Sequence, residues 1–214
     1  STDEIHVRVY ATNRGPETQT IHLLPTLWFR NDWAWGDPVD KPELKAIAAP
    51  RGAKWAVQAD HPTLGTYYLY GRHQAEQLFT ENESNAQKLW GQPHPVPYVK
   101  DAFHRYLIDG ATDAVNPAQV GTKFTAAHVF SVEPGQTVFI GLTLSREALA
   151  EPFAKREVIF AKREAESSVF YDDLLPNSSP EDENILRQSL AGMIWSKQFF
   201  HYDVARWQDG DQLA

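Results

Sequence analysis

Residues 124–144, FTAAHVFSVEPGQTVFIGLTL, decide the fold class of this chain. On either side of Glu133-Pro134-Gly135-Gln136, apolar residues recur at every second position, which is the period of a β-strand with one buried face. Proline sets φ at the first central position of a turn, and glycine tolerates the positive φ of the second, as a type II turn requires. The stretch therefore predicts two strands, 124–132 and 138–144, joined as an antiparallel hairpin.

The same alternation opens the chain. Apolar residues occupy every second position of 5–11, and a β-rich aromatic run follows at 21–29, after turn chemistry at 13–16. These two segments predict a second antiparallel hairpin, across which His6 and His22 would face each other. Two exposed histidines in such a position are more often solvated than metal-bound. Further strands are expected at 55–59, 66–70, 77–80 and 103–108.

After Ser145 the composition changes to Ala, Glu, Lys and Arg, which are good helix formers. A helix is expected over 152–175. Ser179 and Pro180 then suit the N-cap and first position of a second helix, which runs to about residue 202 and carries apolar and aromatic residues around much of its circumference. One short preceding helix cannot cover such a surface. The sequence therefore predicts that the chain is part of a longer protein in which a helical domain follows residue 214.

Composition excludes several classes of function. The 214 residues include 20 Lys and Arg against 28 Asp and Glu, a net charge of -8 that disfavours nucleic acid and anionic lipid as partners. The absence of cysteine excludes disulfides, thiolate metal sites and a cysteine nucleophile. The sequence shows no long apolar run and no signal-peptide pattern. It predicts no membrane segment, no cofactor and no metal site, and it leaves the compartment open with a preference for the cytoplasm.

Strong catalytic motifs are also absent: the sequence has no phosphate-binding glycine loop, no dinucleotide fingerprint, no zinc-binding His pair and no nucleophile elbow. Glu81 and Glu83 would share one side of an extended segment at roughly 7 Å, which favours a polar loop over a catalytic pair flanking a substrate. The aromatic cluster Trp28, Trp33 and Trp35 suits either sugar stacking or core packing. Trp33 and Trp35 are the stronger sugar candidates, because Trp28 lies in the expected strand.

Several stretches carry a resemblance to a known family. They are HLLPTLWFRN (22–31), WAWG (33–36), FTENE (79–83), PYVKD (97–101), DAVNP (113–117), GTK (121–123), RQSLAGMIWSKQ (187–198), YDV (202–204) and RW (206–207). Together they resemble a bacterial group of glucosidase-like proteins related to mannosyl-oligosaccharide glucosidase, glycoside hydrolase family sixty-three. The resemblance implies a mainly β fold: the later part of an N-terminal antiparallel β-sandwich domain in 1–146, a linker helix in 147–179, and in 180–214 the first helix of an (α/α)6 barrel that is otherwise absent.

The resemblance implies that the parent protein is an inverting glycoside hydrolase acting on an α-glucoside or related oligosaccharide. One carboxyl group would protonate the leaving oxygen while another activates water. The family's catalytic motifs would lie beyond residue 214, so no catalytic residue is expected here. Trp33, Trp35, Asn116 and Lys123 are candidates either for contacting carbohydrate or for joining this domain to the missing C-terminal helical domain. Two alternatives remain, a stand-alone carbohydrate-binding module and a pure interaction domain.

Overall fold

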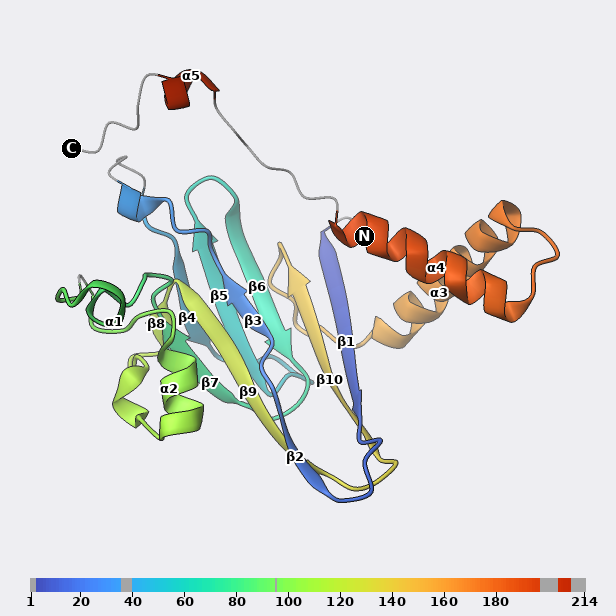
Figure 1. The fold of residues 1–214 in the computed structure, drawn as a ribbon, viewed down its shortest axis with the longest axis horizontal. Helices are drawn as coiled ribbons and strands as arrows, with labels where there is room; N and C mark the ends of the chain where they lie inside the picture. Colours follow the sequence, from blue (N-terminus) through green and yellow to red (C-terminus); the bar gives the residue numbers. More distant parts are fainter. Residues whose placement is uncertain (1–2, 36–39, 95, 197–203, 209–214) are drawn as a thin grey trace. The chain divides into compact units, whose positions relative to one another are not determined.

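The computed structural model describes residues 3–35, 40–94, 96–196 and 204–208 (Figure 1). The chain divides into two compact units, Ser1–Ala154 and Lys155–Ala214, each described here by itself. The first unit is mainly β and antiparallel, as expected. Its strands are β1 (Glu4–Thr12), β2 (Gln19–Leu23), β3 (Thr26–Trp28), β4 (Glu43–Ile47), β5 (Trp55–His61), β6 (Gly65–Gly71), β7 (Glu76–Thr80), β8 (Val120–Gly121), β9 (Lys123–Val132) and β10 (Thr137–Ser145). Its helices are α1 (Ala86–Trp90), α2 (Ala102–Asp109) and the 3-10 turns η1 (Trp33–Trp35) and η2 (Thr112–Ala114).

Two antiparallel sheets form this unit. One has the strand order β1-β10-β6-β5-β4-β8. In the other, β9 is central, with β7 on one edge and β2 and β3 on the opposite edge. β2 and β3 keep one register along β9 and are separated only by Leu24 and Pro25. The expected strand 21–29 is therefore present but interrupted, because proline has no N–H to donate to the ladder.

Both predicted hairpins are wrong in their pairing. β1 pairs with β10, and β2 pairs with β9, so the strands of each predicted hairpin lie in different sheets. The turn at 133–136 does form, with Gly135 at φ 74° and a bond from the Gln136 N–H to the Glu133 carbonyl. It is joined to the other turn, because the Asn13 N–H donates to the Gln136 carbonyl at 3.0 Å. His6 and His22 are consequently on different sheets.

A shared core joins the two sheets. Its buried residues come from both of them, namely Leu44, Trp55, Val57, Ala59, Leu69, Phe79, Phe124, Ala126 and Leu142. The Trp55 ring of β5 lies 5.4 Å from the Phe124 ring of β9, and that ring lies 4.9 Å from Phe79 of β7. The mainly β, antiparallel character expected from the alternation is therefore confirmed, with the inward positions of both sheets in one cluster.

Residues 103–108 form part of helix α2 rather than the expected strand. Phe103, Tyr106 and Leu107 follow the three- and four-residue spacing of a helix face, and they pack with Leu78 and Ala127 in a second cluster on the opposite side of β9. Gly110 ends the helix at φ 69°, where its N–H reaches the Arg105 carbonyl. Over only six residues, the apolar period of a strand and that of a helix are difficult to distinguish. Packing on β7 and β9 favours the helix.

His128 gives the first unit a predictable acid sensitivity. It is 2% exposed on β9, and its Nδ1 lies 3.0 Å from the Gln74 carbonyl. Burial lowers the pKa of its imidazole from the ordinary 6.5. Just below pH 6.5 the unfolded chain therefore binds the proton first, so the free energy of unfolding falls as pH decreases through this window.

The measurement is urea unfolding of the wild type and His128→Gln between pH 7.5 and 5. Glutamine can still donate to the Gln74 carbonyl, but it does not titrate. We expect a shallower loss of stability in the variant. Identical slopes for the two proteins would contradict this assignment.

The second unit contains α3 (Arg156–Leu174), α4 (Pro180–Ser196) and α5 (Val204–Gln208). The helices expected at 152–175 and from Pro180 are present, and the Asp182 N–H donates to the Ser179 hydroxyl at the start of α4. Arg187 of α4 donates to Ser167 of α3 at 3.2 Å. Large apolar side chains of α4 are exposed, with Met193 at 67% and Trp195 at 85%. Residues 197–202 of the predicted helix lie outside the described residues. Among the described residues, no helix is long and apolar enough to cross a membrane.

Candidate functional site

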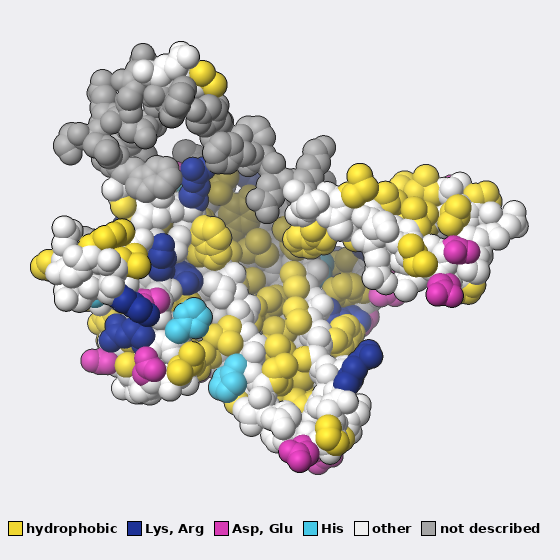
Figure 2. All heavy atoms as spheres, viewed as in Figure 1, with side chains coloured by type: hydrophobic (Ala, Val, Ile, Leu, Met, Phe, Trp, Pro, Cys, Tyr) yellow, Lys and Arg dark blue, Asp and Glu magenta, His cyan; other side chains and the backbone are white. Residues whose placement is uncertain are grey.

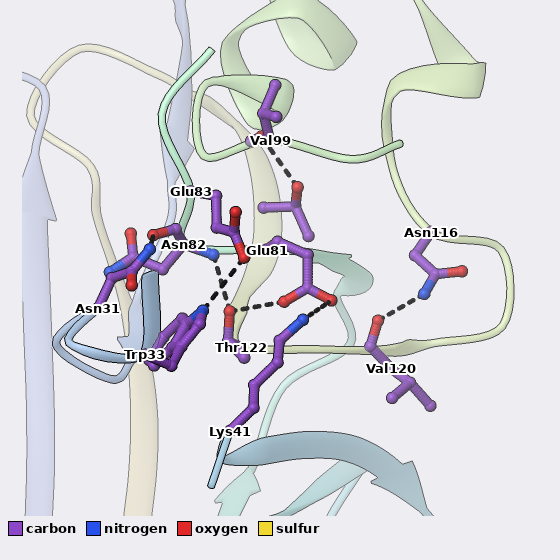
Figure 3. Close-up of polar contacts among 11 residues, drawn as sticks. Asn31, Trp33, Lys41, Glu81, Asn82, Glu83, Val99, Asn116, Val120 and Thr122 are labelled. Atoms are coloured by element: carbon purple, nitrogen blue, oxygen red, sulfur yellow. Dashed lines mark hydrogen bonds and ion pairs between the residues drawn. The ribbon is translucent and has the colours of Figure 1, made fainter. Parts of the chain in front are cut away.

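A polar cluster brings together five of the stretches that carry the family resemblance (Figure 3). We call it the Glu81–Glu83 cluster. Its members come from the segment before η1, the segment after β7, the loop before α2, and the turn between β8 and β9; they are Asn31, Trp33, Thr80, Glu81, Asn82, Glu83, Val99 and Thr122, with Lys41 at its side. These stretches are far apart in sequence, and hydrogen bonds between them fix one surface of the first unit.

Asn82 is the centre of this cluster. Its side-chain amide donates to the Phe29 carbonyl at 2.8 Å, and its own carbonyl accepts from the Asn31 amide at 2.9 Å. Its backbone N–H donates to the Thr122 hydroxyl at 2.8 Å. Asn82 therefore connects the end of β3, the end of β7 and the start of β9. Local sequence patterns do not reveal this role of Asn82, because its partners are 40 to 53 positions away.

The two carboxylates of the cluster have partners of their own. Glu81 accepts from the Thr122 hydroxyl at 2.7 Å and forms an ion pair with Lys41 at 3.0 Å. Glu83 is buried and accepts from the indole N–H of Trp33 at 3.1 Å. Both side chains thus hold neighbouring segments in place. This arrangement agrees with a structural loop rather than with acid and base groups flanking a substrate.

Two of the four predicted site residues have local roles. Trp33 is half-buried against Glu83, and Asn116 donates to the Val120 carbonyl at 2.7 Å while its side-chain oxygen accepts from the Ala118 N–H at 3.0 Å. The Asn116 N–H also reaches the Phe79 carbonyl. Asn116 therefore shapes the loop between η2 and β8. The backbone of Trp35 ends η1, and its side chain lies outside the described residues.

A groove of about 600 Å³ adjoins the cluster, on the side of the second sheet that faces α2. Figure 2 shows histidine and apolar side chains on this face, between α2 and β2. The groove is lined by His22, Leu24, Thr26, Trp28, Asn82, Phe103, His104, Leu107, Ile108 and Lys123. Asn82 belongs to both features, so the polar cluster supports one wall of the groove.

Lys123 is the predicted site residue that lines this groove. Its Nζ donates to the Lys100 carbonyl at 2.7 Å and lies 5.0 Å from the centre of the Phe103 ring. Burial lowers the pKa of the Lys123 amine, and the positive charge of Lys100 lowers it further. An amine held in this way presents a partly desolvated donor to any ligand in the groove.

Trp28 lines the groove together with Phe103, although the sequence favours Trp33 and Trp35 over Trp28 as candidates for sugar contact. Its side chain is 54% exposed, whereas its neighbour Leu27 packs against the core. Strand alternation contained this signal: once Leu27 points inward, Trp28 must point to the opposite face of the sheet. The described residues contain no group of three or more His, Asp or Glu side chains placed to hold a metal ion.

No family model matches the chain. An uncharacterized protein of Saccharomyces cerevisiae, YMR196W, is 31% identical over 245 aligned positions, which cover 97% of this chain and 22% of the yeast protein. The chain thus spans about a fifth of the length of this relative.

Proposed function

We propose that this chain is a non-catalytic part of an inverting, glucosidase-like glycoside hydrolase that acts on an α-glucoside or a related oligosaccharide. The two sheets would be the β-sandwich of that protein, and α4 would begin an (α/α)6 barrel that holds the catalytic carboxyl groups. The observation that supports this proposal is the Glu81–Glu83 cluster, because five stretches with the family resemblance meet in it. Stretches that were independent in the sequence thus belong to one surface.

The groove beside the cluster is the proposed contact site for carbohydrate. The half-exposed indole of Trp28 offers a flat apolar face for a sugar ring, and His22, Asn82, His104 and Lys123 offer polar atoms for hydroxyl groups. Lys123 keeps the binding role proposed from the sequence. Trp33 and Asn116 are assigned instead to maintaining loops next to the groove, because their polar atoms bond locally and neither residue lines it.

Replacing Trp28 by alanine should weaken the binding of maltooligosaccharides by about tenfold, because a stacked aromatic face contributes roughly 1–2 kcal/mol. Isothermal titration calorimetry of the full-length polypeptide measures this change. Trp90→Ala is the matched control, since Trp90 is 64% exposed on α1 and does not line the groove. Equal losses of affinity in the two variants would contradict the assignment of this groove.

The hydrolase itself is tested by incubating the full-length polypeptide with α-glucosides and following the anomer of the released sugar. Inversion of configuration is expected. Residues 1–214 alone should give no turnover. If the isolated segment hydrolyses glucosides at enzymatic rates, the catalytic groups are not in the proposed barrel.

One observation favours a second function, that of an interaction module. Leu24, Leu107 and Ile108 make much of the groove wall apolar, and Ile108 is 77% exposed. Such a surface also suits the docking of another domain. In that case Trp28→Ala would lower the melting temperature of the full-length polypeptide, and titration with sugars would give no heat in the wild type.

A further inference from the structure

Strand β1 exposes its apolar residues, whereas His6 and Arg8 on its polar face are partly covered. Ile5, Val7 and Val9 are 59%, 37% and 38% exposed. On the other face, the His6 side chain is only 7% exposed, and its ring bonds to the Thr143 hydroxyl at 3.0 Å. Apolar side chains normally lie on the buried side of a strand. The exposed apolar side chains of β1 therefore indicate that another element covers them.

The exposed residues belong to the face that forms the core one strand away. In the antiparallel register, Ile5, Val7 and Val9 lie opposite Leu144, Leu142 and Ile140 of β10, three residues on the inward face. Ile140 is 2% exposed and Leu142 is 7% exposed. Core burial therefore stops between β10 and β1. The apolar inner face of the sheet extends from β10 onto β1, but the described residues do not cover it on β1.

β1 also presents an edge of backbone groups. The Asn13 N–H donates to the Gln136 carbonyl and the Arg146 N–H donates to the Asp3 carbonyl, which places residues 3 and 13 in hydrogen-bonded pairs with β10. In an antiparallel ladder, hydrogen-bonded pairs alternate with non-hydrogen-bonded pairs. The backbone groups of Val7 and Val9 therefore bond to β10, whereas the N–H and C=O groups of His6 and Tyr10 point away from β10. Among the described strands, β1 pairs with β10 alone.

The other sheet has an edge on the same side. β2 pairs only with β9 among the described strands, and a cavity of about 270 Å³ lies where β1 ends and β2 begins. Ala11, Ile21 and Val132 contribute its apolar wall. Figure 2 shows a band of apolar side chains along this side, over β2, β9, β10 and β1. The space between the two sheets is therefore open along the β1 and β2 edges.

We propose that a further β-strand adds to the edge of β1 and closes this side, and that the strand comes from the same polypeptide outside residues 1–214. A strand fits because it satisfies the outward backbone groups while its alternate side chains cover Ile5, Val7 and Val9. The same polypeptide is the favoured source because this region matches only 22% of the yeast relative, in which most of the chain lies outside the matched segment. The inference does not depend on the proposed function.

Hydrogen exchange of the full-length polypeptide, resolved to single amides, tests the inference. The amides of His6 and Tyr10 should exchange on the order of 100-fold more slowly than in an unprotected chain, as is also expected for the amides of Val7 and Val9. Val7 and Val9 are internal controls, because β10 protects them whether or not a further strand is present. Rapid exchange at His6 and Tyr10 beside slow exchange at Val7 and Val9 would overturn the inference.

Two further measurements identify the occupant. Ile5→Lys should lower the melting temperature of the full-length polypeptide by several degrees more than Leu64→Lys, a matched control because Ile5 is 59% and Leu64 is 54% exposed. On an uncovered edge strand, lysine is well tolerated, so equal effects of the two variants would count against a covering strand. Protection of His6 and Tyr10 that rises with protein concentration would show that a second copy of the chain pairs with β1, and would overturn the assignment to the same polypeptide.

Discussion

Replacement of Trp55 by alanine is expected to lower the free energy of unfolding of the first unit by about 3–5 kcal/mol. Trp55 is 2% exposed on β5 and is the largest buried side chain in the shared core. Its ring lies 5.4 Å from Phe124 of the other sheet, so its loss removes a contact that joins the two sheets and leaves a cavity between them. Urea unfolding followed by far-ultraviolet circular dichroism measures the change.

Gly71 provides a control for the origin of this effect. A Cβ at Gly71 would lie 1.9 Å from the Trp55 ring, so Gly71→Ala should destabilise the protein by overpacking. In the double variant, which combines Trp55→Ala with Gly71→Ala, the added methyl group occupies space that the indole has left. Its destabilisation should therefore be smaller than the sum of the two single losses. Strict additivity would show that Gly71 and Trp55 do not compete for one volume.

The second large effect is expected for Gly121→Ala, which should lower the free energy of unfolding by about 3 kcal/mol. A Cβ at this position would lie 2.3 Å from the Thr80 carbonyl oxygen, a backbone atom that cannot rotate away. The segment after β7 must then move, and the bond from the Thr122 N–H to the Thr80 carbonyl is strained or lost. Thermal melting measures the loss of stability.

Because Asn82 follows directly after this segment, Gly121→Ala should also weaken sugar binding in the groove. Gly192→Ala in α4 is the control, since an added Cβ there meets no atom within 4 Å and alanine favours a helix. A Gly121→Ala protein that melts with the wild type would show that the close approach of β8 to Thr80 is not required.

Local pattern predicted most of the long strands, although 103–108 is helical and β4 was not expected, and long-range packing decided how the strands pair. The alternation at 5–11 and 138–144 predicts one buried apolar face in each strand; this holds for Ile140 and Leu142 of β10, whereas Ile5, Val7 and Val9 of β1 are exposed. The pairing of β1 with β10 depends instead on contacts such as that between His6 and Thr143, which are 137 positions apart. Turn chemistry at 133–136 also specified a reversal without specifying that the flanking strands separate into two sheets.

The candidate site was predictable to a similar extent. Lys123 followed from the family resemblance, and the position of Trp28 followed from alternation beside Leu27. The partner of Trp33 did not, because the carboxylate that accepts its indole N–H is 50 positions away. The helical spacing of Phe103, Tyr106 and Leu107 could not be recognised, because the segment is too short to distinguish a helix period from a strand period.

The pairing of β1 with β10 has a consequence for synthesis. β1 is the first strand of this region to leave the ribosome, and its partner follows more than a hundred residues later. At a translation rate of roughly 5–20 residues per second, β10 is synthesised on the order of ten seconds after β1. During that interval the exposed apolar residues of β1 make the nascent chain prone to aggregation. We therefore expect general chaperones to bind the nascent chain until the central strands have been synthesised.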